Sequence, residues 1–257
     1  MSRHVEAWIN GKSIFEASPL VILREPRIDP AEEELTTAER PGQPGALLIS
    51  NKRTRLTVTL GFVLRNIFDL AARDKALEAV NGWAKDGVLT LSSKPFRQLQ
   101  MIVTKRASMG EIRDYNTVYS IECAAIACPF WQGTHPTFNV ATGASGTVPL
   151  WPDGTVERVP LEFTVTPATA ALTSFSISAG GQTMAFSGFS LPKSKSLKLF
   201  YDENMLQWIT LDGVSSLGAR TRQSADQLFV IPGQHNSISY TANTSVAIEV
   251  SARRLFL

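Results

Sequence analysis

Few residues of this chain have types and spacings that support chemistry. The three histidines, His4, His135 and His235, lie in separate segments, and none has a histidine or cysteine at metal-ligand spacing. Asp202 and Glu203 are adjacent carboxylates, but they fall in a sequence typical of a turn, where acidic side chains bind the backbone. A turn is therefore favoured over a glycosidase pair, and no metal site is predicted.

Nucleophilic catalysis has no sequence signature either. The chain contains no nucleophile elbow, no glycine-rich phosphate loop and no Walker-type lysine. Its two cysteines, Cys123 and Cys128, are five residues apart in one predicted strand and point to opposite faces. This spacing favours two buried reduced thiols over a disulfide. We predict a protein that is not an enzyme and holds no cofactor.

A run of acidic residues is one candidate for a functional segment. Glu32, Glu33 and Glu34 lie in a polar stretch between Arg24 and Gly45 that lacks strand periodicity and is longer than an ordinary connection. A solvated acidic loop or short helix is one interpretation of these glutamates. A segment that contacts another molecule is the other.

Aromatic residues of the second half are the other candidate. Trp151 and Trp208, together with Phe200 and Tyr201, could form a surface on which sugar rings stack. Aromatic side chains on alternating strands more commonly pack in a core, and the sequence does not decide between these two roles.

Composition excludes several classes of function. The chain has 257 residues and a net charge of +2, which gives no support for a nucleic-acid or anionic-membrane partner. No apolar run approaches the ~18 residues of a membrane span. The first residues, MSRHVEAWINGK, lack the apolar core of a signal peptide, so we expect folding in a cytoplasm.

The stretch from Asp74 to Arg106 contains the clearest structural signals. Leu77, Val80 and Trp83 recur at helical spacing, and Asp74 is expected to cap the helix. A turn at 86–87 then leads to a predicted hairpin, whose strands are 88–91 and 97–105. A helix on a hairpin cannot bury its apolar face alone, so strands predicted at 5–9, 20–23, 47–50, 56–63 and 117–126 must close round it.

The surface changes character halfway along the chain. Residues 1–131 carry 32 of the 48 charged side chains, and residues 132–257 carry 16. Serine and threonine together show the reverse distribution, 16 against 29. We therefore predict two domains, 1–131 and 132–257. The first should be a β-sandwich-like domain with one packed helix.

The second half is predicted to be all-β. Several of its turns are explicit, such as Ala179-Gly180-Gly181. Many short strands separated by turns indicate a sandwich or jelly roll. The predicted strands are 148–151, 158–166, 172–178, 183–187, 197–201, 206–211, 228–231, 237–240 and 246–256.

Taken in order, these features resemble the distal tail proteins of long-tailed, non-contractile bacteriophages. The matching elements are Ile9-Asn10-Gly11-Lys12, RLTVTLG at 55–61, the helix ending at Trp83, DGVLTLSSKPFRQLQMIV and CPFW at 128–131. The chain also ends on a Pro-Gly-x-Asn-like turn at 231–236 and a final basic strand, VAIEVSARRLFL. This turn departs from the pattern, because Gln234 and His235 both stand between Gly233 and Asn236.

The resemblance implies a structural protein of the virion tail tip, assembled in the host cytoplasm. Six N-terminal domains would form a ring between the tail tube protein and the tail-tip hub protein, with a channel through which DNA passes. The C-terminal domain would be a galectin-like sandwich that projects outward and in some members anchors receptor-binding proteins. Under this hypothesis Glu32, Glu33 and Glu34 are expected to face the channel.

Two alternatives stay open at the level of sequence. A carbohydrate-binding module would recognise host glycans through Trp151 and Trp208. A tail-associated hydrolase is the weaker alternative, because no acid–base pair is apparent.

Overall fold

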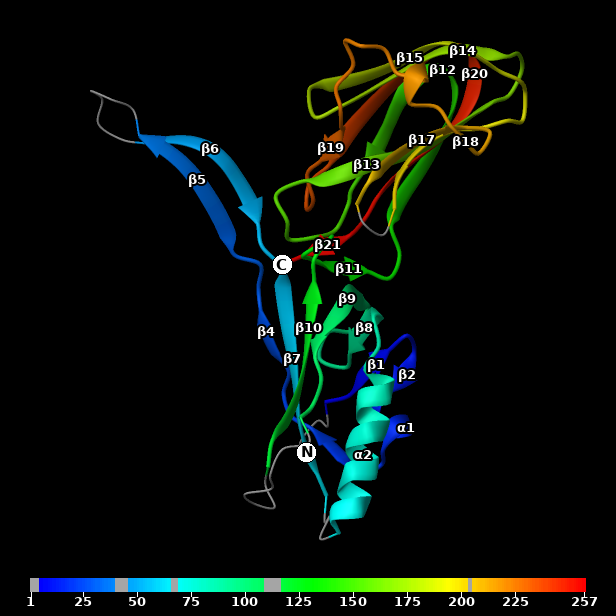
Figure 1. Cartoon of the computed structure of the whole chain (residues 1–257). Helices are drawn as coiled ribbons and strands as arrows, with labels where there is room; N and C mark the ends of the chain where they lie inside the picture. Colours follow the sequence, from blue (N-terminus) through cyan, green and yellow to red (C-terminus); the bar gives the residue numbers. More distant parts are fainter. Residues whose placement is uncertain (1–4, 40–45, 66–68, 109–116, 203–204) are drawn as a thin grey trace. The chain divides into compact units, whose positions relative to one another are not determined.

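The computed structural model describes residues 5–39, 46–65, 69–108, 117–202 and 205–257 (Figure 1). Two compact units divide the chain: Met1–Trp131 together with Leu257, and Gln132–Phe256. Both units are built mainly from antiparallel strands, so the predicted mainly-β fold with one packed helix is confirmed.

The first unit is organised around a sheet in the order β2-β1-β8-β9-β10-β7-β3, with β4 also paired to β7. In β7 every second residue is buried, as the alternation of its sequence predicts. Its elements are β1 (Ala7–Ile9), β2 (Lys12–Ser13), α1 (Ile14–Ala17), β3 (Val21–Leu23), β4 (Arg27–Asp29), β5 (Glu33–Glu39), β6 (Ala46–Arg53), β7 (Leu56–Leu64), α2 (Leu70–Trp83), β8 (Gly87–Leu91), β9 (Arg97–Lys105) and β10 (Tyr119–Ala125). β11 (Trp131–Gly133) lies where the two units meet in sequence.

The helix α2 starts four residues earlier than its apolar periodicity predicts. The capping residue is Asp69, whose carboxylate accepts a hydrogen bond from the Ala71 amide at 3.0 Å. Asp74, the expected cap, instead pairs with Arg73. The first turn was missed because Leu70, Ala71 and Ala72 are exposed and do not extend the buried apolar stripe. The buried face is the predicted one: Ala76, Leu77, Val80 and Trp83.

Asn10 joins the β1–β2 turn to the segment between α2 and β8. Its side chain donates to the Asp86 carbonyl at 3.1 Å and accepts from the Val88 amide at 2.9 Å. The Asn10 side chain can lie this close to the backbone only because residue 87 is a glycine. A Cβ on Gly87 would lie 2.1 Å from Asn10 Oδ1, and the φ of Gly87 is +140°.

The polar stretch from residue 24 to residue 45 is not purely irregular, which corrects the sequence prediction. β4 pairs with β7, and β5 pairs with β6 in a separate two-stranded sheet. Residues 32–37 are all exposed. Because residues 33–37 are exposed on both faces of β5, they show no alternation by which sequence could reveal a strand.

The second unit is a nine-stranded sheet in the order β15-β14-β20-β13-β16-β17-β18, with β12 paired to β20 and β19 to β13. Its elements are β12 (Thr137–Leu150), β13 (Val159–Pro167), β14 (Leu172–Ala179), β15 (Gln182–Leu191), β16 (Leu197–Tyr201), β17 (Gln207–Leu211), β18 (Val214–Ser215), the 3-10 helix η1 (Leu217–Ala219), β19 (Phe229–Val230), β20 (Asn236–Ala252) and β21 (Leu255–Phe256).

The long pair β12–β20 curls the sheet into two layers. Asn139 Nδ2 donates to the Pro149 carbonyl at 2.8 Å, although ten residues of straight strand would span roughly 33 Å. β20 pairs with β13 along one half and with β14 along the other. A cluster of Phe163, Phe175 and Phe186 fills the core, with ring centroids 5.6 to 6.1 Å apart.

Two strand predictions in this unit were wrong in extent. Sequence placed β12 at 148–151 only, and divided β20 into two strands. The missed part of β12 is rich in Gly, Ser, Thr and Ala, and its two large apolar residues, Phe138 and Val140, are exposed. Pairing with β20 holds it extended.

Both cysteines are free and buried, as predicted. Burial raises the pKa of the Cys123 thiol to about 12, with a smaller contribution from the negative charge of Asp86. The thiolate is the reactive form of cysteine, so Cys123 is inert near neutral pH. Among the described residues, no helix is long and apolar enough to cross a bilayer.

Candidate functional site

Groups that could perform catalysis are dispersed in the fold. Within the described ranges, no three His, Cys, Asp or Glu side chains converge as metal ligands. His235 is exposed and its ring stands edge-on to Trp151, with centroids 6.3 Å apart. His4 and Glu203 lie outside the described residues.

The three consecutive glutamates do not form one acidic cluster. Glu32 precedes β5, whereas Glu33 and Glu34 are its first two residues and therefore point to opposite faces. Glu33 pairs with Arg53 across the ribbon at 3.1 Å. All three glutamates are exposed, and the neighbouring Leu35 is 57% exposed. The start of β5 therefore presents both negative charge and an apolar side chain to solvent.

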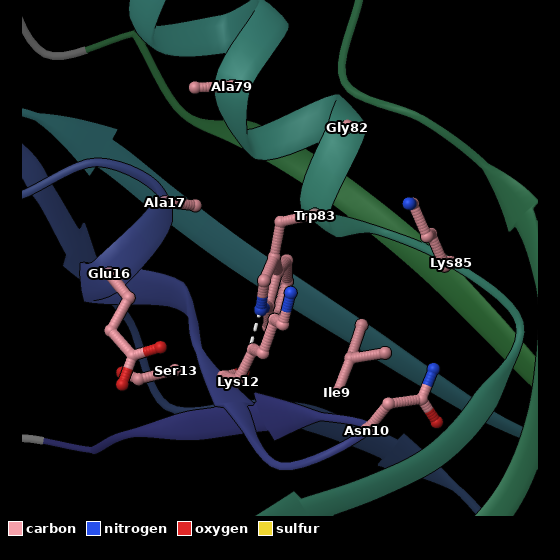
Figure 2. Close-up of a pocket in the computed structure, with 10 residues that line it drawn as sticks. All are labelled: Ile9, Asn10, Lys12, Ser13, Glu16, Ala17, Ala79, Gly82, Trp83 and Lys85. Atoms are coloured by element: carbon pink, nitrogen blue, oxygen red, sulfur yellow. Dashed lines mark hydrogen bonds between the residues drawn. The ribbon is translucent and has the colours of Figure 1, made fainter.

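A groove of about 470 Å³ lies beside the C-terminal half of α2 (Figure 2). Its lining comes from the β1–β2 turn, α1, α2 and the residue after α2's cap. The lining residues are Ile9, Asn10, Lys12, Ser13, Glu16, Ala17, Ala79, Gly82, Trp83 and Lys85. The indole of Trp83 stands in the middle of the groove, where its Nε1 donates to the Lys12 carbonyl at 2.8 Å.

The polar groups of the groove have structural roles or stand on its rim. Ser13 Oγ donates to Glu6 Oε1 at 2.6 Å and accepts from the Phe15 amide, so it caps α1. Lys12 and Lys85 are exposed. Gly82 is a helical glycine with nothing within 4 Å of the position of a Cβ. The groove therefore has Ile9 and Trp83 buried in its floor and Lys12, Glu16 and Lys85 exposed at its rim.

Sequence reasoning missed this groove because its walls are 60 or more residues apart in the chain. The one available signal was Gly82, since glycine inside a helix costs about 1 kcal/mol relative to alanine. A glycine inside a helix therefore indicates that packing or binding at that position excludes a larger side chain.

The structure divides the four aromatic candidates among three environments. Trp208 on β17 is paired with Phe200 on β16, and the two side chains are 41% and 38% exposed. Tyr201 points to the opposite face and is buried. Trp151 is exposed and stands beside His235, after the end of β12. Of the two tryptophans predicted to stack on sugars, only Trp208 belongs to an aromatic pair on an exposed sheet face.

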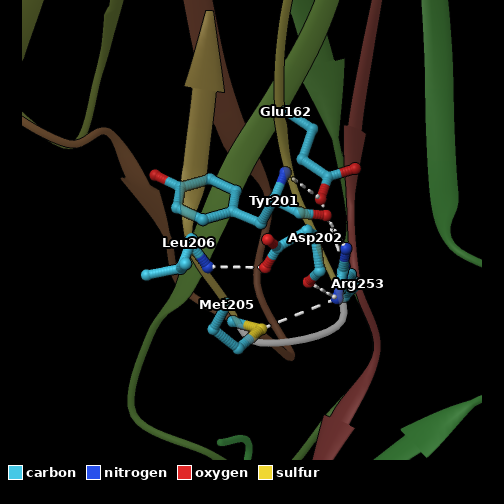
Figure 3. A network of polar contacts seen from close by, with 6 residues as sticks. All are labelled: Glu162, Tyr201, Asp202, Met205, Leu206 and Arg253. Atoms are coloured by element: carbon cyan, nitrogen blue, oxygen red, sulfur yellow. Dashed lines mark hydrogen bonds and ion pairs between the residues drawn. The ribbon is translucent and has the colours of Figure 1, made fainter.

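A polar network fixes the hairpin that carries this pair (Figure 3). Arg253 Nε binds Glu162 Oε1 at 3.1 Å, and its other nitrogens donate to the carbonyls of Tyr201 and Asp202. The Asp202 carboxylate accepts from the Leu206 amide at 2.9 Å and from Trp208 Nε1 at 3.0 Å. Arg253 is therefore a largely buried residue that joins β13 to the β16–β17 hairpin.

Tyr201 gives the second unit a predicted sensitivity to alkaline pH. Burial, together with the charge of Glu162, raises the pKa of its phenol to about 12, and its hydroxyl is buried without a hydrogen-bond partner. The pKa of Tyr201 is higher in the folded state than in the unfolded state. Its contribution to the free energy of unfolding is therefore fully present below pH 10 and is lost as pH rises from 10 to 12. We expect Tyr201→Phe to raise the free energy of unfolding by about 1 kcal/mol at pH 7 and to reduce the alkaline loss.

Urea denaturation at pH 7, 10 and 11 measures this effect. Tyr119→Phe, at a buried tyrosine of the first unit, is the control. Equal alkaline loss in Tyr201→Phe and the unmodified protein would show that another group is responsible.

The fold described above is shared with solved structures of phage tail proteins. No protein-family model matches the chain, and no curated protein matches its sequence. Solved structures do match, and the resemblance to phage distal tail proteins is confirmed at the level of the fold.

One matching structure is the SPP1 Dit (gp 19.1) protein, described as a paradigm of the hub adsorption apparatus of phages that infect Gram-positive bacteria. It superimposes with a TM-score of 0.71 and covers 97% of this chain and 98% of its own, at 10% sequence identity. Chains of the phage P2 baseplate in its activated conformation, with Ca or with Sr, match with TM-scores of 0.42 and 0.43. Each covers 97% of this chain and 98% of its own, at 9% and 8% identity.

Proposed function

We propose that this protein is a structural component of a phage tail tip, in which six copies form a ring between the tail tube and the tail-tip hub. The ring leaves a channel for DNA. The fold shared with the SPP1 Dit protein through both units is the observation that carries this proposal. Residues 1–131 form the ring, and residues 132–257 form an outer domain that is available to other proteins of the tail, including receptor-binding proteins.

The ribbon β5–β6 supports assembly with other copies. In the described part of the chain it pairs with no other strand, and a two-stranded ribbon is only marginally stable alone in water. Leu35 on this ribbon is 57% exposed. A neighbouring copy that covers the ribbon would bury this side chain and stabilise the two strands.

The groove beside α2 is the complementary surface on our proposal. In a closed ring of this kind, one patch on each copy contacts a different patch on the neighbouring copy. Ile9 and Trp83 line the groove, and Leu35 is an exposed apolar side chain of the ribbon, so the two surfaces could cover each other's apolar groups. The groove and the ribbon thus supply the two halves of a heterologous interface.

Mass measurement of the purified full chain tests this proposal. Light scattering over rising protein concentration should reach six times the 28.1 kDa of the chain, and negative-stain images should show rings. Addition of tail tubes should promote assembly where the free protein is dilute. A protein that stays monomeric at high concentration, with and without tubes, contradicts the ring.

The acidic residues at the start of β5 allow a test of the channel. We expect Glu32→Gln, Glu33→Gln and Glu34→Gln together to leave rings intact and to slow DNA ejection. Carboxylates that face the channel repel DNA phosphates and prevent them from adhering. The slowing should be about two- to fivefold, because salt screens exposed charges.

Ejection from virions that carry the triple variant measures this rate. Glu157→Gln, at an exposed acid of the second unit, is the control. An unchanged ejection rate would place the three glutamates away from the channel. Loss of rings would assign them to the interface between copies.

A further inference from the structure

The outer face of the second unit carries a group of side chains that no part of the ring requires. Buried residues alternate with outward ones along β13, β16 and β20, so the register defines this face. Thr164 is paired with both Lys198 and Glu249, in a row across three strands. Beside this row stand Phe200 and Trp208, which are paired with each other. We call these five residues the β16–β17 face.

We propose that the β16–β17 face binds a neutral saccharide, with Trp208 and Phe200 as the stacking platform. A sugar ring has an apolar face of C–H groups and an edge of hydroxyls that both donate and accept hydrogen bonds. The face matches this chemistry, because the ammonium donor Lys198 lies two residues from Phe200 on β16. The Thr164 hydroxyl and the Glu249 carboxylate continue the row over the next two strands, where further units of an oligosaccharide would reach them.

Charge favours a neutral ligand. Lys198 and Glu249 are both exposed, and neither has an ion-pair partner among the residues that the structure describes. They stand two strands apart, about 10 Å, with Thr164 between them. One positive and one negative charge give no net attraction for an anionic or cationic ligand, whereas both groups can bind hydroxyls.

The platform is held rigid before any ligand arrives. Trp208 Nε1 donates to Asp202 Oδ2 at 3.0 Å, which fixes the orientation of the indole plane. Arg253 holds Asp202 through its carbonyl and is itself bound to Glu162 (Figure 3). A ring that is already fixed loses little side-chain conformational entropy when a ligand binds. This matters most for a small ligand, because it makes few contacts to offset that loss.

The extent of the apolar surface argues against a protein as the occupant. A stable protein interface buries about 800 Å² on each partner, and its buried centre is depleted of charged residues. Here two partly exposed aromatic rings are bordered by the charged Lys198, which lies two residues before Phe200 on the same strand. The apolar area fits a ring-sized ligand.

The test is retention of the full chain on an array of immobilised neutral oligosaccharides built from hexoses and N-acetylhexosamines. The unmodified protein should be retained by at least one of them. Trp208→Ala and Phe200→Ala should each weaken that retention about tenfold or more, because each removes one stacking surface. Trp151→Ala is the matched control, since Trp151 is an exposed tryptophan outside the face, and it should not change retention.

A second variant separates binding from folding. Lys198→Ala removes only an exposed side chain, so circular dichroism and oligomer mass should be unchanged while retention falls. Absence of retention on every neutral glycan overturns the proposal. So does an equal loss in Trp151→Ala, or a Trp208→Ala effect seen only for a protein partner or for anionic glycans. Oligomer mass is measured in the same samples, so failure of saccharide binding is distinguishable from failure of the ring.

Discussion

Arg253→Ala is expected to lower the free energy of unfolding of the second unit by about 2 to 3 kcal/mol. The substitution leaves the Glu162 carboxylate, whose side chain is 18% exposed, without its cation. It also removes the donor to two backbone carbonyls in the β16–β17 hairpin. A half-buried charge that loses its partner costs more than an exposed one, because water replaces the lost interactions only in part.

Urea denaturation followed by tryptophan fluorescence measures this loss. Arg253→Lys should recover only part of it, since an ammonium cannot reproduce the planar fork of guanidinium donors. Arg222→Ala is the control, because Arg222 is exposed and pairs with no acid among the described residues. If Arg253→Ala unfolds at the same urea concentration as the unmodified protein, Arg253 contributes nothing to stability.

A double-mutant cycle with Glu162→Gln assigns the effect to the ion pair. The two substitutions together should cost less than the sum of their separate costs, because each removes the same interaction. The variant also links stability to binding. Arg253 positions Asp202, which orients Trp208, so saccharide retention should fall in Arg253→Ala even at temperatures where the unit stays folded.

Leu35→Asp is expected to convert rings into monomers. In the proposed ring a neighbouring copy covers this side chain, and the substitution replaces buried apolar surface with a charge that has no partner. Loss of leucine burial alone is worth about 1.5 to 3 kcal/mol, and a buried charge adds to it. Each contact between copies should therefore weaken by roughly 100-fold or more.

Light scattering at the concentration where the unmodified protein forms rings detects this change. The monomer itself should unfold at a nearly unchanged temperature, because a substitution at an exposed position alters stability by about 0.5 kcal/mol or less. Val214→Asp, at a residue 70% exposed in the second unit, is the control and should leave rings intact. Rings of unchanged mass in Leu35→Asp would remove the ribbon from the interface.

Local periodicity predicted the elements that bury one face against the rest of the chain. β7 and β9 appear where alternation placed them, and the apolar stripe of α2 is the predicted one. Both cysteines are buried thiols for the same reason, since they belong to an apolar strand and the segment after it.

Elements without a buried face left no such signal. Residues 33–37 of β5 are exposed on both faces, and the unpredicted part of β12 contains mostly Gly, Ser, Thr and Ala, which pairing with β20 holds extended. The candidate surfaces depend on contacts between residues far apart in the chain, such as Lys12 with Trp83 and Glu162 with Arg253. Periodicity reports on burial within one segment, whereas these contacts depend on how distant segments pack, and for that reason only the folded chain reveals them.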